Sequence, residues 1–207
     1  QVPLTPLDTG EGSALSFNYI WSGRYFDDAQ MPSSGFGVGF ELGGGITLGS
    51  DRQPFQRTMF RWIGFRPLER GRIQLRTELG AVLARERARI PATQLFRTGG
   101  DTTVRGYGYL DIGVPLAGDL VGPGRYLAVG SVEWQRPIRV RGQPSSFEHT
   151  VFLDAGSVAD RPAELNARVG VGTGVRWRSP VGPVEAAVAY GVQAKRFRVH
   201  FTAGFTF

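Results

Sequence analysis

The sequence of 207 residues contains no cysteine, two histidines and a single lysine, Lys195. The lack of cysteine excludes disulfide bonds and thiolate metal sites. The histidines, His149 and His200, fall on different strand-like segments, and their spacing does not match a metal site. No strand–turn–helix pattern accompanies a candidate catalytic serine. We therefore expect no cofactor, no bound metal and no enzymatic activity.

Long apolar runs are missing as well. No stretch of about 18 apolar residues occurs, which excludes a transmembrane helix. A membrane-spanning β-barrel is still compatible with the sequence, because its strands show only segments of about ten residues that alternate in hydrophobicity. The formal net charge is +6, but the arginines are scattered along strand-like segments rather than clustered, which argues against a nucleic-acid partner.

What the sequence does contain is alternation of apolar with polar or small residues. In the last eleven residues, Phe197, Val199 and Phe201 alternate with Arg198 and His200. A period of two assigns each set to one face of a strand. About nine segments follow this pattern, with no convincing helix and no domain boundary. They cover residues 15–22, 36–48, 55–65, 73–83, 126–138, 148–155, 168–178, 184–192 and 197–207.

Charged residues on the polar face favour a barrel over a sandwich. Unpaired charge in a dry sandwich core is very costly, whereas a polar lumen accommodates it. Aromatic residues near strand ends are typical of the girdles at a membrane interface; they are Trp21, Tyr25, Phe26, Trp134 and Trp177. We predict an all-β fold, an antiparallel transmembrane β-barrel. On pattern alone, a soluble all-β domain that binds a ligand stays the alternative.

The connections between these segments suggest an orientation. Residues 67–71 and 179–183 form tight turns, as periplasmic turns of outer-membrane barrels do, and they fall on the same side as the chain's end. The longest connection, about residues 87–124, then falls on the outer side. Loops longer than about 12–15 residues are usually functional or disordered. The connection after Phe26 is longer than a periplasmic turn is expected to be.

The longest connection contains glycines around an arginine, Arg105. Gly99, Gly100, Gly106 and Gly108 let the backbone turn sharply or approach other groups closely. An arginine held there keeps its charge and offers a planar fork of donors to a carboxylate. An exposed loop arginine is the other interpretation that these residues leave open.

Four motifs together resemble one protein family. They are residues 104–107 (Val-Arg-Gly-Tyr) with Phe96, Gly99 and Gly100 before them, residues 152–156 (Phe-Leu-Asp-Ala-Gly), residues 174–183, and residues 204–207 (Gly-Phe-Thr-Phe). In this order and spacing they resemble the last part of the barrel in the BamA/TamA superfamily of outer-membrane insertases, and more closely its TamA branch. The resemblance spans most of the chain. It implies a barrel of sixteen strands, of which this chain holds about nine.

The resemblance also implies a site. In the family the long loop folds back into the lumen, and its motif arginine meets the aspartate of a strand. Carried over, Arg105 pairs with Asp154, and Phe152 stacks nearby. The flanking motif residues complete this loop–lumen strut: Val104, Gly106, Tyr107, Gly99 and Gly100. The strand phase independently places Phe152 and Asp154 on the inward face.

A second implied site is the terminal strand, with Phe201, Gly204, Phe205 and Phe207. Its aromatic end resembles the outer-membrane targeting signal, and in the family this strand forms a weak lateral seam with the first strand. An edge strand with unpaired backbone groups can template a client strand, and a glycine such as Gly204 weakens local packing. Simple closure of a barrel is the alternative interpretation.

The resemblance finally implies a domain and a function. Residues 1–207 are expected to be the C-terminal part of an outer-membrane β-barrel of the bacterial surface antigen type, without the POTRA domains that precede it in the family. The expected function is to help insert or secrete β-barrel proteins, such as autotransporters, in the Gram-negative outer membrane. Expected partners are the lipid bilayer, lipopolysaccharide, client outer-membrane proteins and a TamB-like periplasmic protein anchored in the inner membrane.

Three other kinds of outer-membrane barrel protein remain alternatives to this function. They are a BamA-type insertase, a two-partner secretion transporter and the barrel of a patatin-type lipase. A passive outer-membrane channel with a plugging loop is the alternative from another class.

Overall fold

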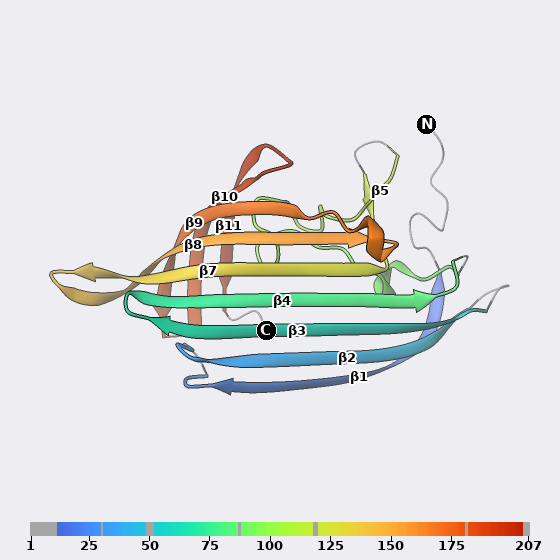
Figure 1. Cartoon of the computed structure of the whole chain (residues 1–207), viewed down its shortest axis with the longest axis horizontal. Helices are drawn as coiled ribbons and strands as arrows, with labels where there is room; N and C mark the ends of the chain where they lie inside the picture. Colours follow the sequence, from blue (N-terminus) through green and yellow to red (C-terminus); the bar gives the residue numbers. More distant parts are fainter. Residues whose placement is uncertain are drawn as a thin grey trace.

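The computed structural model of the chain describes residues 12–29, 31–48, 52–86, 88–117, 120–180 and 182–204. In this part of the chain nine antiparallel strands form one sheet, in which each strand pairs with the strand before it (Figure 1). The strands are β1 (Ser13–Phe26), β2 (Gly35–Leu48), β3 (Pro54–Leu68), β4 (Gly71–Ala84), β7 (Tyr126–Val140), β8 (Gln143–Ala159), β9 (Arg168–Ser179), β10 (Gly182–Gly191) and β11 (Arg196–Ala203).

The remaining elements are short and lie in connections. Strands β5 (Val114–Pro115) and β6 (Val121–Gly122) pair inside the loop between β4 and β7, and two 3₁₀ turns occupy η1 (Ala92–Gln94) and η2 (Pro162–Glu164). Among the described residues, no helix is long and apolar enough to cross a membrane.

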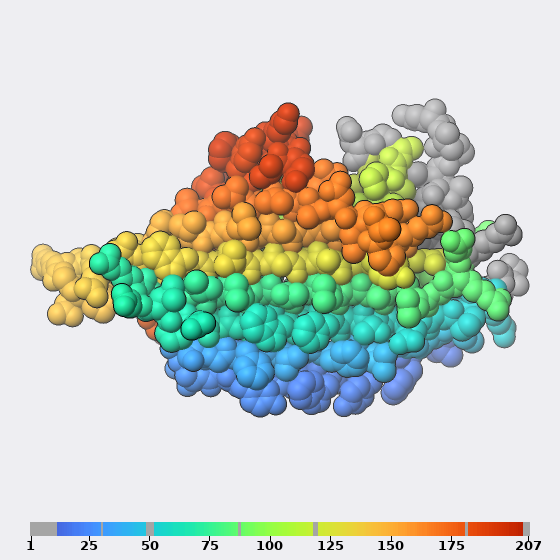
Figure 2. Space-filling view, in the orientation of Figure 1, coloured from blue at the N-terminus to red at the C-terminus, as the bar shows by residue number. Residues whose placement is uncertain are grey.

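The predicted all-β antiparallel fold is confirmed, and each of the nine predicted segments overlaps one strand. The largest difference is β8, which begins at Gln143 rather than at residue 148. There β7 and β8 extend as a hairpin beyond the neighbouring strands (Figure 2). Its two turn residues, Arg141 and Gly142, both have positive φ, as tight hairpins with primed turns require. Residues 143–147 lack the apolar alternation, so the sequence pattern missed this extension.

The two faces of the sheet differ in chemistry as a period of two requires. On β8, Val151 and Leu153 are 40% and 49% exposed, whereas Thr150, Phe152 and Asp154 are buried. The outer face carries exposed apolar side chains along the whole sheet, among them Phe17, Leu75, Leu79, Val171, Val175 and Phe201. His149 lies on this outer face and is hydrogen-bonded to Thr173. The outer face is therefore apolar and exposed along the sheet, as the lipid-facing side of a membrane barrel is expected to be.

The long loop between β4 and β7 packs on the inner face of the sheet. Its side chains join those of β3, β4, β7 and β8 in one apolar cluster, which includes Phe55, Met59, Val82, Ile90, Phe96, Val104, Tyr107, Ile112, Val129 and Val158. The tight turns lie at the opposite end of the strands from the roots of this loop (Figure 1). The core thus sits between the sheet and a loop that has almost no regular structure of its own.

The sheet has two edges. In the described part of the chain, β1 pairs with β2 and β11 pairs with β10, and no pairing joins β1 to β11. The longer connection after β1 folds across the end of the sheet, where Arg178 Nε of β9 contacts Met31 Sδ at 3.1 Å and Pro32 is buried.

Candidate functional site

The Val-Arg-Gly-Tyr segment lies directly on the backbones of β9 and β10, at glycines. A Cβ atom added to Gly170 of β9 would lie 1.7 Å from the Arg105 carbonyl oxygen. A Cβ atom added to Gly191 of β10 would lie 2.5 Å from the Gly106 carbonyl oxygen. Gly106 itself has φ +95°, which favours glycine. The loop and the sheet therefore touch backbone to backbone, with no room for a side chain between them.

Arg105 is fully engaged with Asp154 of β8. Its Nε donates to Asp154 Oδ2 at 2.7 Å, its Nη2 donates to Oδ1 at 3.0 Å, and its backbone N–H donates to Oδ2 at 3.0 Å. Ser131 of β7 donates a further hydrogen bond to Oδ1 at 2.6 Å. Asp154 is completely buried, so its charge depends on these donors. Bidentate pairing of this kind fixes the orientation as well as the position of the guanidinium group.

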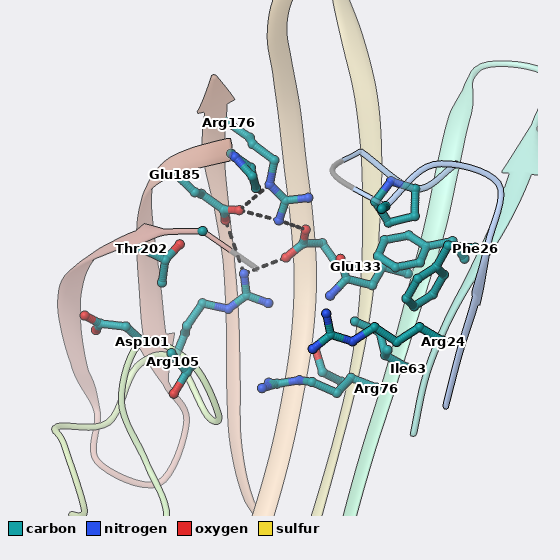
Figure 3. Close-up of a pocket in the computed structure, with 18 residues that line it drawn as sticks. Arg24, Phe26, Ile63, Arg76, Asp101, Arg105, Glu133, Arg176, Glu185 and Thr202 are labelled. Atoms are coloured by element: carbon teal, nitrogen blue, oxygen red, sulfur yellow. Dashed lines mark hydrogen bonds and ion pairs between the residues drawn. The ribbon is translucent and has the colours of Figure 1, made fainter. Parts of the chain in front are cut away.

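The same guanidinium group also contacts two glutamates. Arg105 Nη1 lies 2.6 Å from Glu133 Oε2 on β7 and 3.2 Å from Glu185 Oε1 on β10. Arg176 of β9 bridges the same two glutamates from the other side, at 2.6 Å and 2.5 Å. Figure 3 shows these four side chains joined into one network around a cavity of about 120 Å³. Loop and four strands are thus tied together by alternating charges.

Phe152 completes the environment of Arg105. Its ring is buried, and the Arg105 Cζ atom lies 3.3 Å from the ring centroid. A planar guanidinium group stacks well on an aromatic face, and the attraction increases when both partners are removed from water. Burial alone would lower the pKa of Arg105, but its hydrogen bonds and the charges of Asp154 and Glu133 raise that pKa above its usual value. Arg105 is therefore a permanent cation.

Sequence comparison identifies the family to which this arrangement belongs. The profile of the Omp85 superfamily domain matches residues 3–207. The chain belongs to the Omp85 superfamily.

Two similar proteins carry the name BamA. The "outer membrane protein assembly factor BamA" of Nitratidesulfovibrio vulgaris (strain Hildenborough) is 30% identical over 179 residues, which make up 82% of this Omp85 chain and 22% of that protein. The crystal structure of BamA from Haemophilus ducreyi lacking POTRA domains 1–3 matches with a TM-score of 0.69 and 22% identity, over 93% of this chain and 42% of that one. The second likeness concerns the fold. This Omp85 chain spans about a fifth of the length of the curated relative.

The predicted superfamily and location are confirmed. Omp85 proteins of this kind are β-barrel proteins of Gram-negative outer membranes, and the outer membrane is the location of this chain. The finer assignment to the TamA branch stays a prediction.

The other motif residues of this Omp85 chain shape the loop around Arg105. Gly99 and Gly100 have φ +109° and +108°, so the backbone turns at a pair that favours glycine. Val104 is completely buried and packs against Gly156 of β8. The Tyr107 hydroxyl donates to Gln193 Oε1 in the β10–β11 turn, at 2.5 Å. The structure therefore brings the loop motif into contact with β8 and with the last hairpin.

The predicted residues of the terminal strand are only partly visible. Phe201 points outward and is 69% exposed, as the alternation requires. Gly204 follows the last residue of β11 with φ +87°, and its N–H donates to the Pro183 carbonyl oxygen at 2.8 Å. Phe205 and Phe207 lie outside the described residues.

Sequence reasoning missed four residues of this site: Glu133, Glu185 and His200, which contact the loop, and Arg176, which bridges the two glutamates. Each is charged or polar at an inward position of its strand, and that phase was readable for Arg176, Glu185 and His200. Contact between them depends on the register between strands, which pairs Arg176 with Glu185 directly. Register between segments far apart in the sequence was the missing information.

Proposed function

We propose that this chain is the C-terminal, strand-presenting part of an outer-membrane protein assembly factor, and that β11 is the edge at which client β-barrel proteins add their strands. The observation that carries the proposal is the state of β11. Its backbone pairs with β10 alone in the described part of the chain, and its outward side chains Phe197, Val199 and Phe201 are exposed and apolar. An edge strand of this kind can template another strand by β-augmentation.

The charged strut supports the edge in this proposal. Arg105 and its carboxylates hold the loop against the inner face, so that the strands next to β11 have a fixed curvature while β11 itself keeps a free side. The role is one of positioning and requires no cofactor. The name of the N. vulgaris relative, an outer membrane protein assembly factor, supports the same function.

The finer proposal is a TamA-type role. In it the clients are β-barrel proteins of the autotransporter kind, the periplasmic partner is a TamB-like protein anchored in the inner membrane, and lipopolysaccharide phosphates contact arginines of the outer loops. The loop motif and the terminal residues 204–207 support this branch. We expect the purified full-length protein to accelerate the insertion of autotransporter barrels but of no other outer-membrane barrel. Equal acceleration of both would favour a general BamA-type insertase.

A crosslinking experiment tests the edge directly. A photoreactive amino acid is placed at Val199 of β11 or, as a matched control, at Leu75 of β4; both side chains are exposed on the outer face, but β4 is paired on both sides. We expect crosslinks to nascent client strands from position 199 and none from position 75 in the full-length protein. Client crosslinks of equal yield at both positions, or at neither, contradict the proposal.

Large, steady conductance in planar bilayers would instead favour a passive channel.

A further inference from the structure

The inner face of the terminal strand is hydrogen-bonded to the loop motif through a histidine. His200 of β11 is 4% exposed and lies beside Ala187 of β10. The Gly106 N–H donates to His200 Nε2 at 2.8 Å, and His200 Nδ1 is hydrogen-bonded to Asp101 Oδ1. A backbone amide can only donate, so Nε2 must be the unprotonated nitrogen. The proton of the neutral ring is therefore on Nδ1, where it is donated to Asp101.

This hydrogen bond connects the loop, which buried ion pairs fix in place, to the edge strand β11, which pairs with one neighbour in the described part of the chain. Gly106 follows Arg105, whose side chain is fixed by the buried carboxylates of β7, β8 and β10. His200 belongs to an edge strand whose ladder runs along β10 alone in the described part of the chain. The hydrogen bond from Gly106 to His200 is thus a short path from the rigid charge cluster to the free edge.

The other contacts between the loop and the last hairpin do not reach the buried face of β11. Arg105 and Gly106 contact β10, at Glu185 and Gly191. Arg198 Nη2 lies 3.2 Å from Asp111 Oδ2, and both side chains are about half exposed, so this pair contributes little. Tyr107 binds Gln193, which lies in the turn rather than in the strand. His200 provides the only buried side-chain contact between loop and terminal strand among the described residues.

We propose that His200 is a positioning residue that latches β11 to the docked loop, so that the mobility of the free edge depends on whether the loop is docked. Its imidazole acts as a hydrogen-bond acceptor for the Gly106 amide, and Asp101 keeps the ring in the tautomer that can accept. The consequence for client strands, namely that an undocked loop loosens the edge to which they add, rests on the proposed function. The latch itself does not.

Three substitutions and a control test the latch. His200→Leu removes the acceptor, whereas His200→Gln keeps an oxygen acceptor near the position of Nε2. Asp101→Ala leaves the ring intact but removes the group that fixes its tautomer, and Asp101 is about half exposed, so this variant avoids a change in the core. His149→Leu is the matched control, because His149 is on the outer face and bonds to Thr173 instead of the loop.

The readout is hydrogen–deuterium exchange of residues 196–204 in the full-length protein in lipid nanodiscs. Loss of one buried hydrogen bond should raise exchange of this segment about three- to tenfold in His200→Leu. We expect a smaller rise in Asp101→Ala, near wild-type exchange in His200→Gln, and no change in His149→Leu. If His200→Leu fails to fold, the contrast between Asp101→Ala and His149→Leu carries the test.

The opposite pattern would overturn the latch. Unchanged exchange in both His200→Leu and Asp101→Ala, or a rise in His200→Gln as large as in His200→Leu, means that the ring only fills space. Client crosslinking from position 199, measured on the same variants, separates the two proposals. If exchange of β11 becomes faster while client crosslinks are unaltered, the latch is supported. The same result refutes the claim that the latch affects the edge to which client strands add.

Discussion

Arg105 holds the loop in place through ion pairs with the carboxylates around it. Arg105, which is buried, and Arg176, whose side chain is 13% exposed, face the carboxylates of three strands, so each acid of this cluster has a cationic partner. Removing one partner of a buried ion pair leaves the other charges without compensation, which is far more destabilising than the pair is stabilising.

We expect Arg105→Ala to destabilise the folded protein by about 3–5 kcal/mol and to release the loop from the sheet. The measurements are the urea midpoint in detergent micelles and the rate at which protease cleaves within residues 97–111. Arg161→Ala is the control, because Arg161 is 67% exposed and its ion pair with Glu86 is on the surface; its effect should stay below about 1 kcal/mol. A loop equally resistant to protease in both variants would contradict the role of Arg105.

At the residue scale, the sequence was informative about Arg105, Asp154 and Phe152. Strand phase placed Asp154 and Phe152 on the inner face, and the resemblance paired them with the loop arginine. Glu133 and Glu185 could not be found in this way, because their contact with Arg105 depends on how β7 and β10 align with β8. His200 was readable only as an inward polar residue, and nothing in the sequence indicated the Gly106 amide as its partner.

At the scale of elements, the glycines of β9 and β10 explain how an irregular loop can dock on a sheet. The loop backbone contacts the strands at Gly170 and Gly191, where there is no side chain to keep it at a distance. A side chain at either position would push the loop away from the charge cluster.

We expect Gly170→Ala to undock the loop, because the added Cβ would lie 1.7 Å from the Arg105 carbonyl oxygen. The destabilisation should be about 1–3 kcal/mol or more, as for other overpacked sites. Gly130→Ala in β7 is the matched control, since a Cβ there has nothing within 4 Å. Urea midpoints and loop proteolysis of both variants provide the test. Similar behaviour of the two variants would refute backbone-to-backbone docking.

Elements were predicted well because alternation marks each strand independently. All nine strands were found from a period of two, and the positions of the tight turns followed from them. The course of residues 85–125 was not readable in that way. This loop has almost no periodic pattern, and its position depends on contacts with Asp154, Gly170 and Val169, which are remote in sequence.

At the scale of the whole molecule, one sheet separates two environments. Its outer face is apolar and meets lipid, while its inner face is charged and covered by the loop. In the described part of the chain, the sheet ends at β1 and β11, each of which pairs on one side only. In this account the docked loop restricts the motion of the strands that it contacts. The hydrogen bond to His200 restricts the motion of β11 as well.

The central claim is that the charged strut holds the loop on the inner face, and a disulfide measures this most directly. The 207 residues contain no cysteine, so Val104→Cys with Gly156→Cys gives one defined pair among them. A Cβ at Gly156 would lie 2.5 Å from Val104 Cγ2, which places the two sulfurs within bonding reach. Full-length protein in outer membranes should form this disulfide rapidly under mild oxidation, and much more slowly when Arg105→Ala is added. Absence of the disulfide, or equal rates in both backgrounds, would contradict the account.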